Sequence, residues 1–203
     1  MKGLITFEGI DRSGKSTQVL LLAGFLAQCD IPVTTTQEPG GTPTGMKLKE
    51  IVLGSEHVNE YAELFLYLAD RSHHVDKIIR PALQAGHIVI CDRYGDATVA
   101  YQGYGRGLDL GLINQLNQLV TGNLCPMVTF LLDLDPHLAA LRSPCRDRIE
   151  SESERFHRRV RDGYVELAAE NPARFVVIDA THSSLAIHEE VKQALRARLP
   201  LSR

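Results

Sequence analysis

Between residues 9 and 17 the chain reads GIDRSGKST, and this stretch decides the fold class. It completes the pattern G-x-x-x-x-G-K-[ST] directly after the apolar run Gly3–Phe7, which has the composition of a buried strand. Gly9 and Gly14 let backbone N–H groups close around phosphate oxygens, because no Cβ stands in the way. Lys15 can reach the outer phosphates, and the hydroxyl after it can hold Mg²⁺. The stretch therefore predicts a loop that binds a nucleoside triphosphate.

The residues after this loop have helical spacing. Apolar side chains recur at i, i+3, i+4, i+7 and i+8, at Val19, Leu22, Ala23, Leu26 and Ala27. Such a helix turns one face to a core and directs its N-terminus at the bound anion. The alternative is a glycine turn that only joins a strand to a helix. We favour nine ligand-binding residues: Gly9, Ile10, Asp11, Arg12, Ser13, Gly14, Lys15, Ser16 and Thr17.

The composition is that of a soluble globular protein. Of the 203 residues, 44% are hydrophobic and 23% are charged, and the net charge is −3. This charge gives no support for general binding to nucleic acid or to acidic membranes. The four cysteines, Cys29, Cys91, Cys125 and Cys145, show neither C-x-x-C pairing nor metal-like spacing with histidines. With no secretory or membrane-spanning segment in the sequence, we expect reduced thiols in a cytoplasmic protein.

Apolar runs alternate with helical patterns along the whole length, as in a parallel sheet covered by helices. We predict strands at residues 3–8, 33–37, 87–91, 127–133 and 174–179, and later helices at 46–53, 60–80, 110–121, 150–170 and 184–198. The fold class is α/β, a three-layer α/β/α fold with a five-stranded parallel sheet. We expect a single domain over residues 1–203, interrupted only by a mobile polar break at 143–147.

Polar residues at the ends of predicted strands indicate the chemistry, because ligands of α/β sheets collect there. Asp92 ends an apolar strand, as does the acid that holds the Mg²⁺ shell in phosphoryl-transfer proteins, and Arg93 follows it. The turn 38–42 presents a carboxylate after the second strand. Around the polar break, Arg142, Arg146 and Arg148 supply guanidinium groups that suit binding to a phosphate during its transfer.

In these residues the chain closely resembles the thymidylate kinase family of nucleoside monophosphate kinases. The shared motifs, in order, are FEG at 7–9, EPGGT at 38–42, YLADR at 67–71, DRY at 92–94, AYQG at 100–103, DRIE at 147–150 and IDA at 178–180. They cover nearly the entire chain. The resemblance implies direct in-line transfer of the γ-phosphoryl group of ATP to dTMP with Mg²⁺, in a homodimer with a short lid at about 142–149.

The resemblance assigns acceptor binding to Asp11, Glu38, Pro39, Lys49, Tyr67, Arg71, Arg93, Thr98, Tyr101 and Gln102. Tyr67 replaces a phenylalanine that stacks on thymine, Arg71 donates to a base carbonyl, and Thr98 with Gln102 reads the other polar edge. Tyr101 crowds the sugar 2′ position, and Asp11 lies near the 3′-hydroxyl. Arg93 holds the acceptor phosphate. Lys49 stands where an arginine is common, and so does Gln37.

The predicted metal ligands are Ser16 and Asp92. The predicted catalytic residues are Lys15, Arg12, Asp92, Arg93, Arg148 and Arg142. The resemblance leaves open which arginine stabilises the transferring group, because one subgroup of the family supplies it from the loop and another from the lid. Our order is Arg12, then Arg148 and Arg142.

Two rival functions remain: a kinase for another nucleotide or deoxynucleoside, and a nucleotide-dependent switch, although the chain has no N-K-x-D motif for guanine. Neighbouring charged residues have simpler interpretations. We expect Arg155, Arg158, Arg159 and Arg161 to lie on a solvated helix face, with Glu154 supporting Arg158 at i+4. We expect His73 and His74 at a helix surface.

Overall fold

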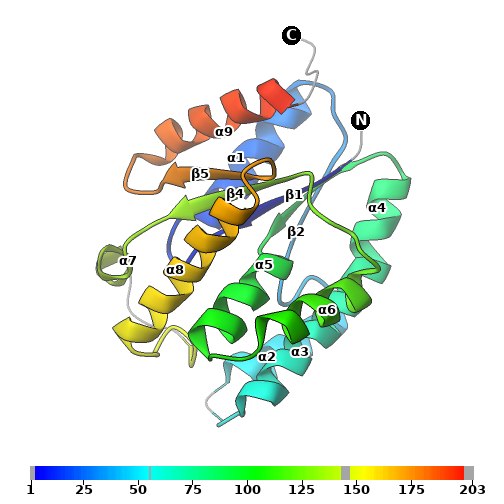
Figure 1. Ribbon diagram of the computed structural model, residues 1–203. Coiled ribbons are helices and arrows are strands. Elements are labelled where there is room, and N and C mark those ends of the chain that lie inside the picture. The colour runs from blue at the N-terminus through cyan, green and yellow to red at the C-terminus, as the bar shows by residue number, and fades with distance from the viewer. Residues whose placement is uncertain (1–2, 55, 143–146, 199–203) are drawn as a thin grey trace.

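Five parallel strands form one sheet in the order β2-β3-β1-β4-β5 within the residues that the computed structural model describes, 3–54, 56–142 and 147–198 (Figure 1). The strands are β1 (Gly3–Glu8), β2 (Val33–Gln37), β3 (Ile88–Asp92), β4 (Val128–Asp133) and β5 (Phe175–Asp179). Each differs from its predicted range by at most one residue at either end. The predicted five-stranded parallel sheet is confirmed.

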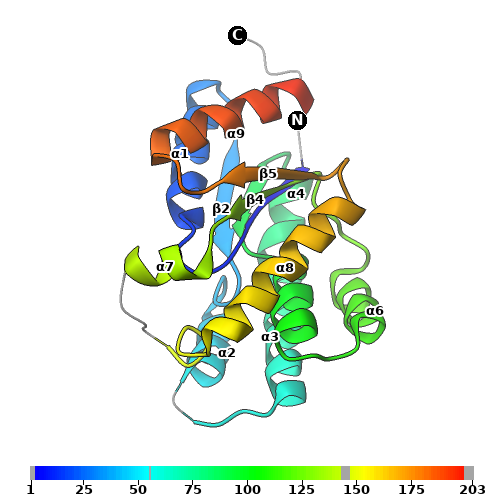
Figure 2. The ribbon, with the colours of Figure 1, turned by 60° about the vertical axis from the view of Figure 1, so that its left-hand side comes forward.

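Helices cover both faces of the sheet, which gives the predicted three layers (Figures 1 and 2). One face carries α1 (Lys15–Gln28) and α9 (Ser184–Arg198). The other carries α8 (Glu154–Glu170), α3 (Glu60–His74) and α6 (Leu110–Thr121). Burial on both faces explains why the strands read as continuous apolar runs.

Capping residues explain where two helices begin. The helix α2 (Pro43–Leu53) begins three residues before the predicted start at 46, because Pro43 suits the first helical position and Thr42 Oγ1 accepts from Gly45 N–H. The helix α8 begins at 154 rather than 150, since Ser153 caps it. Residues 147–150 form a turn instead, and this turn matters for the site.

The predicted helix 60–80 is interrupted. After α3 the chain widens into a π-helical turn, η1 (Val75–Ile79), and then continues as α4 (Arg80–Gln84). Pro81 has no N–H for the carbonyl four residues earlier, and the widening just before it accommodates this loss.

Three helical segments were not predicted: α5 (Gly95–Thr98), the π-helical η2 (Val99–Gly105) and α7 (Pro136–Arg142). The second of these contains Gly103 and Gly105, and glycine has a low helix propensity. A Cβ at Gly105 would lie 2.7 Å from the Phe156 ring, so this glycine permits close packing of η2 on α8. Tertiary packing overrides local propensity here.

Part of the predicted polar break, residues 143–146, lies outside the described residues, together with Arg146 and Cys145. The single domain over 1–203 and the lid at 142–149 therefore stay predictions. Cys29, Cys91 and Cys125 are free thiols. Among the described helices, none has the length and apolar character needed to cross a bilayer.

Candidate active site

The phosphate loop joins the carboxyl end of β1 to the first turn of α1. Gly9 has φ +132°, and a Cβ there would lie 2.5 Å from the carbonyl oxygen of Leu132. Gly14 has φ +101°, a conformation that side chains rarely adopt. The loop therefore requires both glycines. Residues 14–17, which begin with the second glycine, line the pocket.

Lys15 is buried and folds back onto this loop. Its Nζ donates to the carbonyl oxygens of Ile10 at 2.8 Å and Gly9 at 3.1 Å. Burial and the positive charge of Arg93 lower the pKa of Lys15 from 10.5 to about 8, although Asp92 acts in the opposite direction. An anion bound in the loop would favour the charged amine.

Ser16 and Asp92, the two predicted metal ligands, lie together. Ser16 Oγ donates to Asp92 Oδ2 at 2.6 Å, which joins the first turn of α1 to the end of β3. A hydroxyl and a carboxylate are the hard oxygen donors that Mg²⁺ prefers. The donor set therefore fits the predicted ion.

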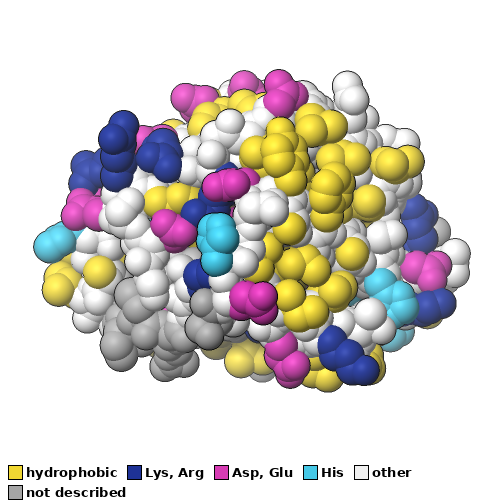
Figure 3. Space-filling model, turned by 90° about the horizontal axis from the view of Figure 1, so that it is seen from below, with side chains coloured by type: hydrophobic (Ala, Val, Ile, Leu, Met, Phe, Trp, Pro, Cys, Tyr) yellow, Lys and Arg dark blue, Asp and Glu magenta, His cyan; other side chains and the backbone are white. Residues whose placement is uncertain are grey.

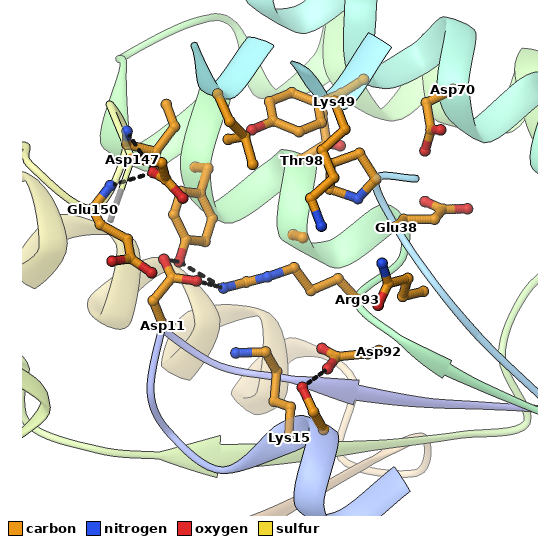
Figure 4. Close-up of a pocket in the computed structure, with 18 of the residues that line it drawn as sticks. Asp11, Lys15, Glu38, Lys49, Asp70, Asp92, Arg93, Thr98, Asp147 and Glu150 are labelled. Carbon is orange, nitrogen blue, oxygen red and sulfur yellow. Dashed lines mark hydrogen bonds and ion pairs between the residues drawn. The ribbon is translucent and has the colours of Figure 1, made fainter. Parts of the chain in front are cut away.

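Arg93 lies at the centre of the pocket and is tied to the phosphate loop (Figure 4). Its Nη2 contacts Asp11 Oδ1 at 2.5 Å, and its Nη1 donates to Gly9 O at 3.0 Å. Tyr101 Oη donates to the other Asp11 oxygen at 2.9 Å. Burial alone would raise the pKa of Asp11, but Arg93, Lys15 and Tyr101 together lower it below its usual range. A backbone φ of +68° at Arg93, unusual for a non-glycine residue, marks this position as specialised.

Arg71 fixes the opposite wall of the pocket. It comes from α3 and is 2% exposed. Its guanidinium donates to Glu38 Oε2 at 2.7 Å, Thr98 Oγ1 at 2.8 Å, Asn117 Oδ1 at 2.6 Å and the carbonyl oxygen of Tyr94 at 2.9 Å. Arg71 thus joins α3 to α6 and to the residues that follow β2 and β3.

The two walls enclose a cavity of about 430 Å³. It is lined by all ten predicted acceptor residues: Asp11, Glu38, Pro39, Lys49, Tyr67, Arg71, Arg93, Thr98, Tyr101 and Gln102. Figure 4 shows Lys49 extending into it from α2 and Lys15 facing it from below. One cavity therefore contains the triphosphate-binding lysine and an aromatic side chain with polar neighbours.

The three arginines considered for the transferring group, Arg12, Arg142 and Arg148, have different surroundings. Arg12 lines the cavity and its Nη2 contacts Glu150 Oε2 at 2.7 Å. Arg142 donates to the carbonyl oxygens of Arg12 and Ala180, and Arg148 donates to Glu63 Oε2 at 2.6 Å. Neither Arg142 nor Arg148 is among the lining residues. Of the three, Arg12 alone lines the cavity.

Sequence reasoning missed several residues of the site. Further lining residues include Asp70, Asp147, Ile149 and Glu150. The last three belong to the DRIE motif, from which only the arginine was assigned a role. His74 was predicted at a helix surface, and this is wrong: its side chain is fully buried, because the turn after β2 packs over it. Of the predicted solvated arginines, Arg158 does pair with Glu154, whereas Arg161 forms a bidentate pair with Asp133.

The fold and the loop define a P-loop phosphotransferase class: a parallel sheet with GxxxxGKS between β1 and α1, facing a second pocket at the strand ends. Residues 7–191 match the family model for thymidylate kinase. The chain belongs to the thymidylate kinase family.

Individual relatives agree over nearly full length. A thymidylate kinase of Synechococcus sp. (strain JA-2-3B'a(2-13)) is 48% identical over 198 residues, which cover 98% of this chain and 96% of the relative. One from Solidesulfovibrio magneticus is also 48% identical, over 92% of this chain and 95% of its own length. The crystal structure of thymidylate kinase from Ehrlichia chaffeensis has a TM-score of 0.80 at 39% identity, covering 96% of this chain and 98% of that one.

Proposed function

We propose that this protein transfers the γ-phosphoryl group of ATP directly to the phosphate of dTMP, giving dTDP and ADP. One observation carries the proposal beyond family membership: Lys15 of the phosphate loop and the Tyr67–Arg71 wall line the same cavity. A donor phosphate and an acceptor phosphate can therefore meet without a covalent enzyme intermediate.

The donor end is assigned to the loop. Backbone N–H groups of residues 14–17 cradle the phosphates, and Lys15 leaves its carbonyl partners to bind the outer ones. Ser16 and Asp92 would hold Mg²⁺, which neutralises charge on the phosphates when bound. Arg12, a residue of the loop that also lines the cavity, is the proposed transition-state arginine.

The acceptor end is assigned to the assembled wall. Tyr67 offers a ring for stacking on the base, while Arg71, Thr98 and Gln102 supply polar contacts. Arg93 moves from Asp11 toward the acceptor phosphate, and Lys49 approaches the same cavity from α2. Lys49 keeps the charge of the usual arginine but has no bidentate fork, so it holds the phosphate less rigidly.

We also propose a cytoplasmic homodimer. Large apolar side chains are exposed on α2, α3 and α6, and they gather on one face in Figure 3; they are Met46, Ile51, Tyr61, Phe65, Leu112 and Leu119. Leu119 is 76% exposed and Phe65 55%. A continuous apolar face suits a second copy of this chain. Light scattering should give a dimer, and Leu119→Glu should shift it to monomer.

A coupled assay of ADP formation tests the substrate assignment. We expect dTMP to be turned over faster than dUMP, dCMP, UMP and thymidine. Faster turnover of any of these would assign the protein to another acceptor. Calorimetry separates the switch alternative, which predicts normal ATP binding and no measurable heat with dTMP.

A further inference from the structure

His74, the last residue of α3, lies behind the pocket wall and contacts the carboxyl end of β2 and the residue that follows it. Its Nδ1 is 2.8 Å from Glu38 Oε1, and its Nε2 is 2.6 Å from Thr36 Oγ1. An ionised carboxylate only accepts hydrogen bonds, so Nδ1 carries the proton and donates to Glu38. Nε2 then accepts from the Thr36 hydroxyl. This pairing fixes both the tautomer and the plane of the ring.

Glu38 passes this orientation on to Arg71. One carboxylate oxygen, Oε1, accepts from His74, and the other, Oε2, accepts from Arg71 Nε at 2.7 Å. The side chains of Glu38, His74 and Arg71 are 3%, 0% and 2% exposed, so water does not replace a lost partner easily. The carboxylate is held from both sides and cannot rotate without breaking a buried bond.

Arg71 has five N–H groups, and four of them donate to described residues. The fifth belongs to Nη2, and Arg71 lines the cavity. The direction of this remaining donor depends on the plane of the guanidinium, which Glu38 helps to fix through Nε, together with Thr98, Asn117 and the carbonyl oxygen of Tyr94. A small rotation of Glu38 would therefore misdirect the one group that Arg71 has for a ligand.

We propose that His74 is a positioning residue for the acceptor pocket: through Glu38 it holds the guanidinium of Arg71 in the plane that presents its remaining N–H to the pyrimidine. The inference rests on the proposed function. The inference predicts that His74 affects KM for dTMP but not KM for ATP. Among the described residues, Lys15 and its loop share no contact with the His74–Glu38–Arg71 chain.

Two other interpretations of the same cluster are open to test. His74 can act only as packing for the turn after β2, since a Cβ at Gly41 would lie 2.5 Å from its Nε2. Glu38, His74 and Cys91 also place donor atoms within 4.8 Å of one another, as in a metal site. Both interpretations predict different results from those of a positioning residue.

The experiment compares His74→Ala, His74→Asn and His74→Gln with the wild type, measuring KM for dTMP and for ATP, kcat and the melting temperature. His74→Ala should raise KM for dTMP about tenfold, which is the size expected for one misdirected charged hydrogen bond. KM for ATP should stay within about twofold of the wild-type value. Asparagine places an N–H where Nδ1 lies, so His74→Asn should recover most of the loss, whereas glutamine, which mimics Nε2, should not. The matched control is His73→Ala, on the same helix but partly exposed.

A second arm repeats His74→Ala in an Arg71→Met background. If His74 acts through Arg71, the substitution should add little to KM for dTMP there. Four outcomes would each overturn the inference. In the variants these are equal rises in both KM values, recovery by glutamine alone, or a lowered melting temperature with normal KM. In the purified wild type it is stoichiometric metal. Failure of the wild type to phosphorylate dTMP would overturn the proposed function as well, and so is distinguishable from a failure confined to His74.

Discussion

The two ends of the pocket are built in different ways. The donor end is one continuous stretch, residues 9–17, whose backbone N–H groups we propose as the phosphate binders. The acceptor end is assembled from β2, α2, α3, β3, η2 and the turn 147–150, which side-chain ion pairs hold together. Substitutions at the first should therefore alter the rate, whereas substitutions at the second should alter the affinity for one substrate.

The largest effect is expected at the donor end. Lys15→Ala should lower kcat by about 10³, because the charge it removes is felt most strongly in the transition state. The melting temperature should change little, since Nζ bonds only to loop carbonyls and Ser13 among the described residues. Steady-state kinetics with thermal denaturation checks both. Turnover near that of the wild type would remove Lys15 from the mechanism.

At the acceptor end, Arg71→Ala should raise KM for dTMP about 50-fold and KM for ATP much less. The substitution deletes the proposed donor to the base and leaves the buried Glu38 carboxylate without its arginine partner. Lys49→Ala, in the same cavity but only partly buried, gives a comparison for loss of another cation. Equal weakening of both substrates would contradict the division between the two ends.

Glu63 tests whether the assembled wall behaves as one unit. This buried carboxylate accepts hydrogen bonds from Gln102, Arg106 and Arg148. Glu63→Gln leaves Arg148 without its carboxylate partner and Arg106 with Glu152 alone, so we expect a loss of about 3 kcal/mol in the free energy of unfolding and a rise of about fivefold in KM for dTMP. Urea denaturation and kinetics measure the two effects. As a control, Glu154→Gln removes the exposed partner of Arg158 and should change neither the free energy of unfolding nor KM for dTMP.

The smallest effect concerns pH. Glu8 is fully buried beneath both ends, and burial with the nearby charge of Asp96 raises its pKa from 4.5 to about 8. Between these values the folded chain holds a proton that the unfolded chain has lost, so stability falls as pH rises through this window. Glu8→Gln cannot ionise and keeps an acceptor for Tyr94 N–H. The melting temperature of the variant should therefore gain on the order of 5 °C relative to wild type between pH 6 and pH 9; parallel profiles would contradict this.

The same comparison explains what the sequence could reveal. The strands, α1 and the phosphate loop follow from contiguous patterns, so they were predicted closely. On α3 the polar residues Glu63, Arg71 and His74 share one side with Tyr67, while Tyr61 and Phe65 are exposed. A polar stripe usually faces water, but here it faces the pocket, because the turn after β2 and the turn 147–150 pack over it. Which distant segments arrive there cannot be read from the helix itself.

The pair between Arg93 and Asp11 bears on which molecules can enter. The carboxylate of Asp11 holds the guanidinium of Arg93, so a ligand must compete with Asp11 for this cation. We expect a thymidine without its phosphate to compete poorly, because it offers Arg93 no negative charge. A monophosphate carries two negative charges and should compete better. The Arg93–Asp11 pair is therefore expected to favour charged acceptors over neutral nucleosides.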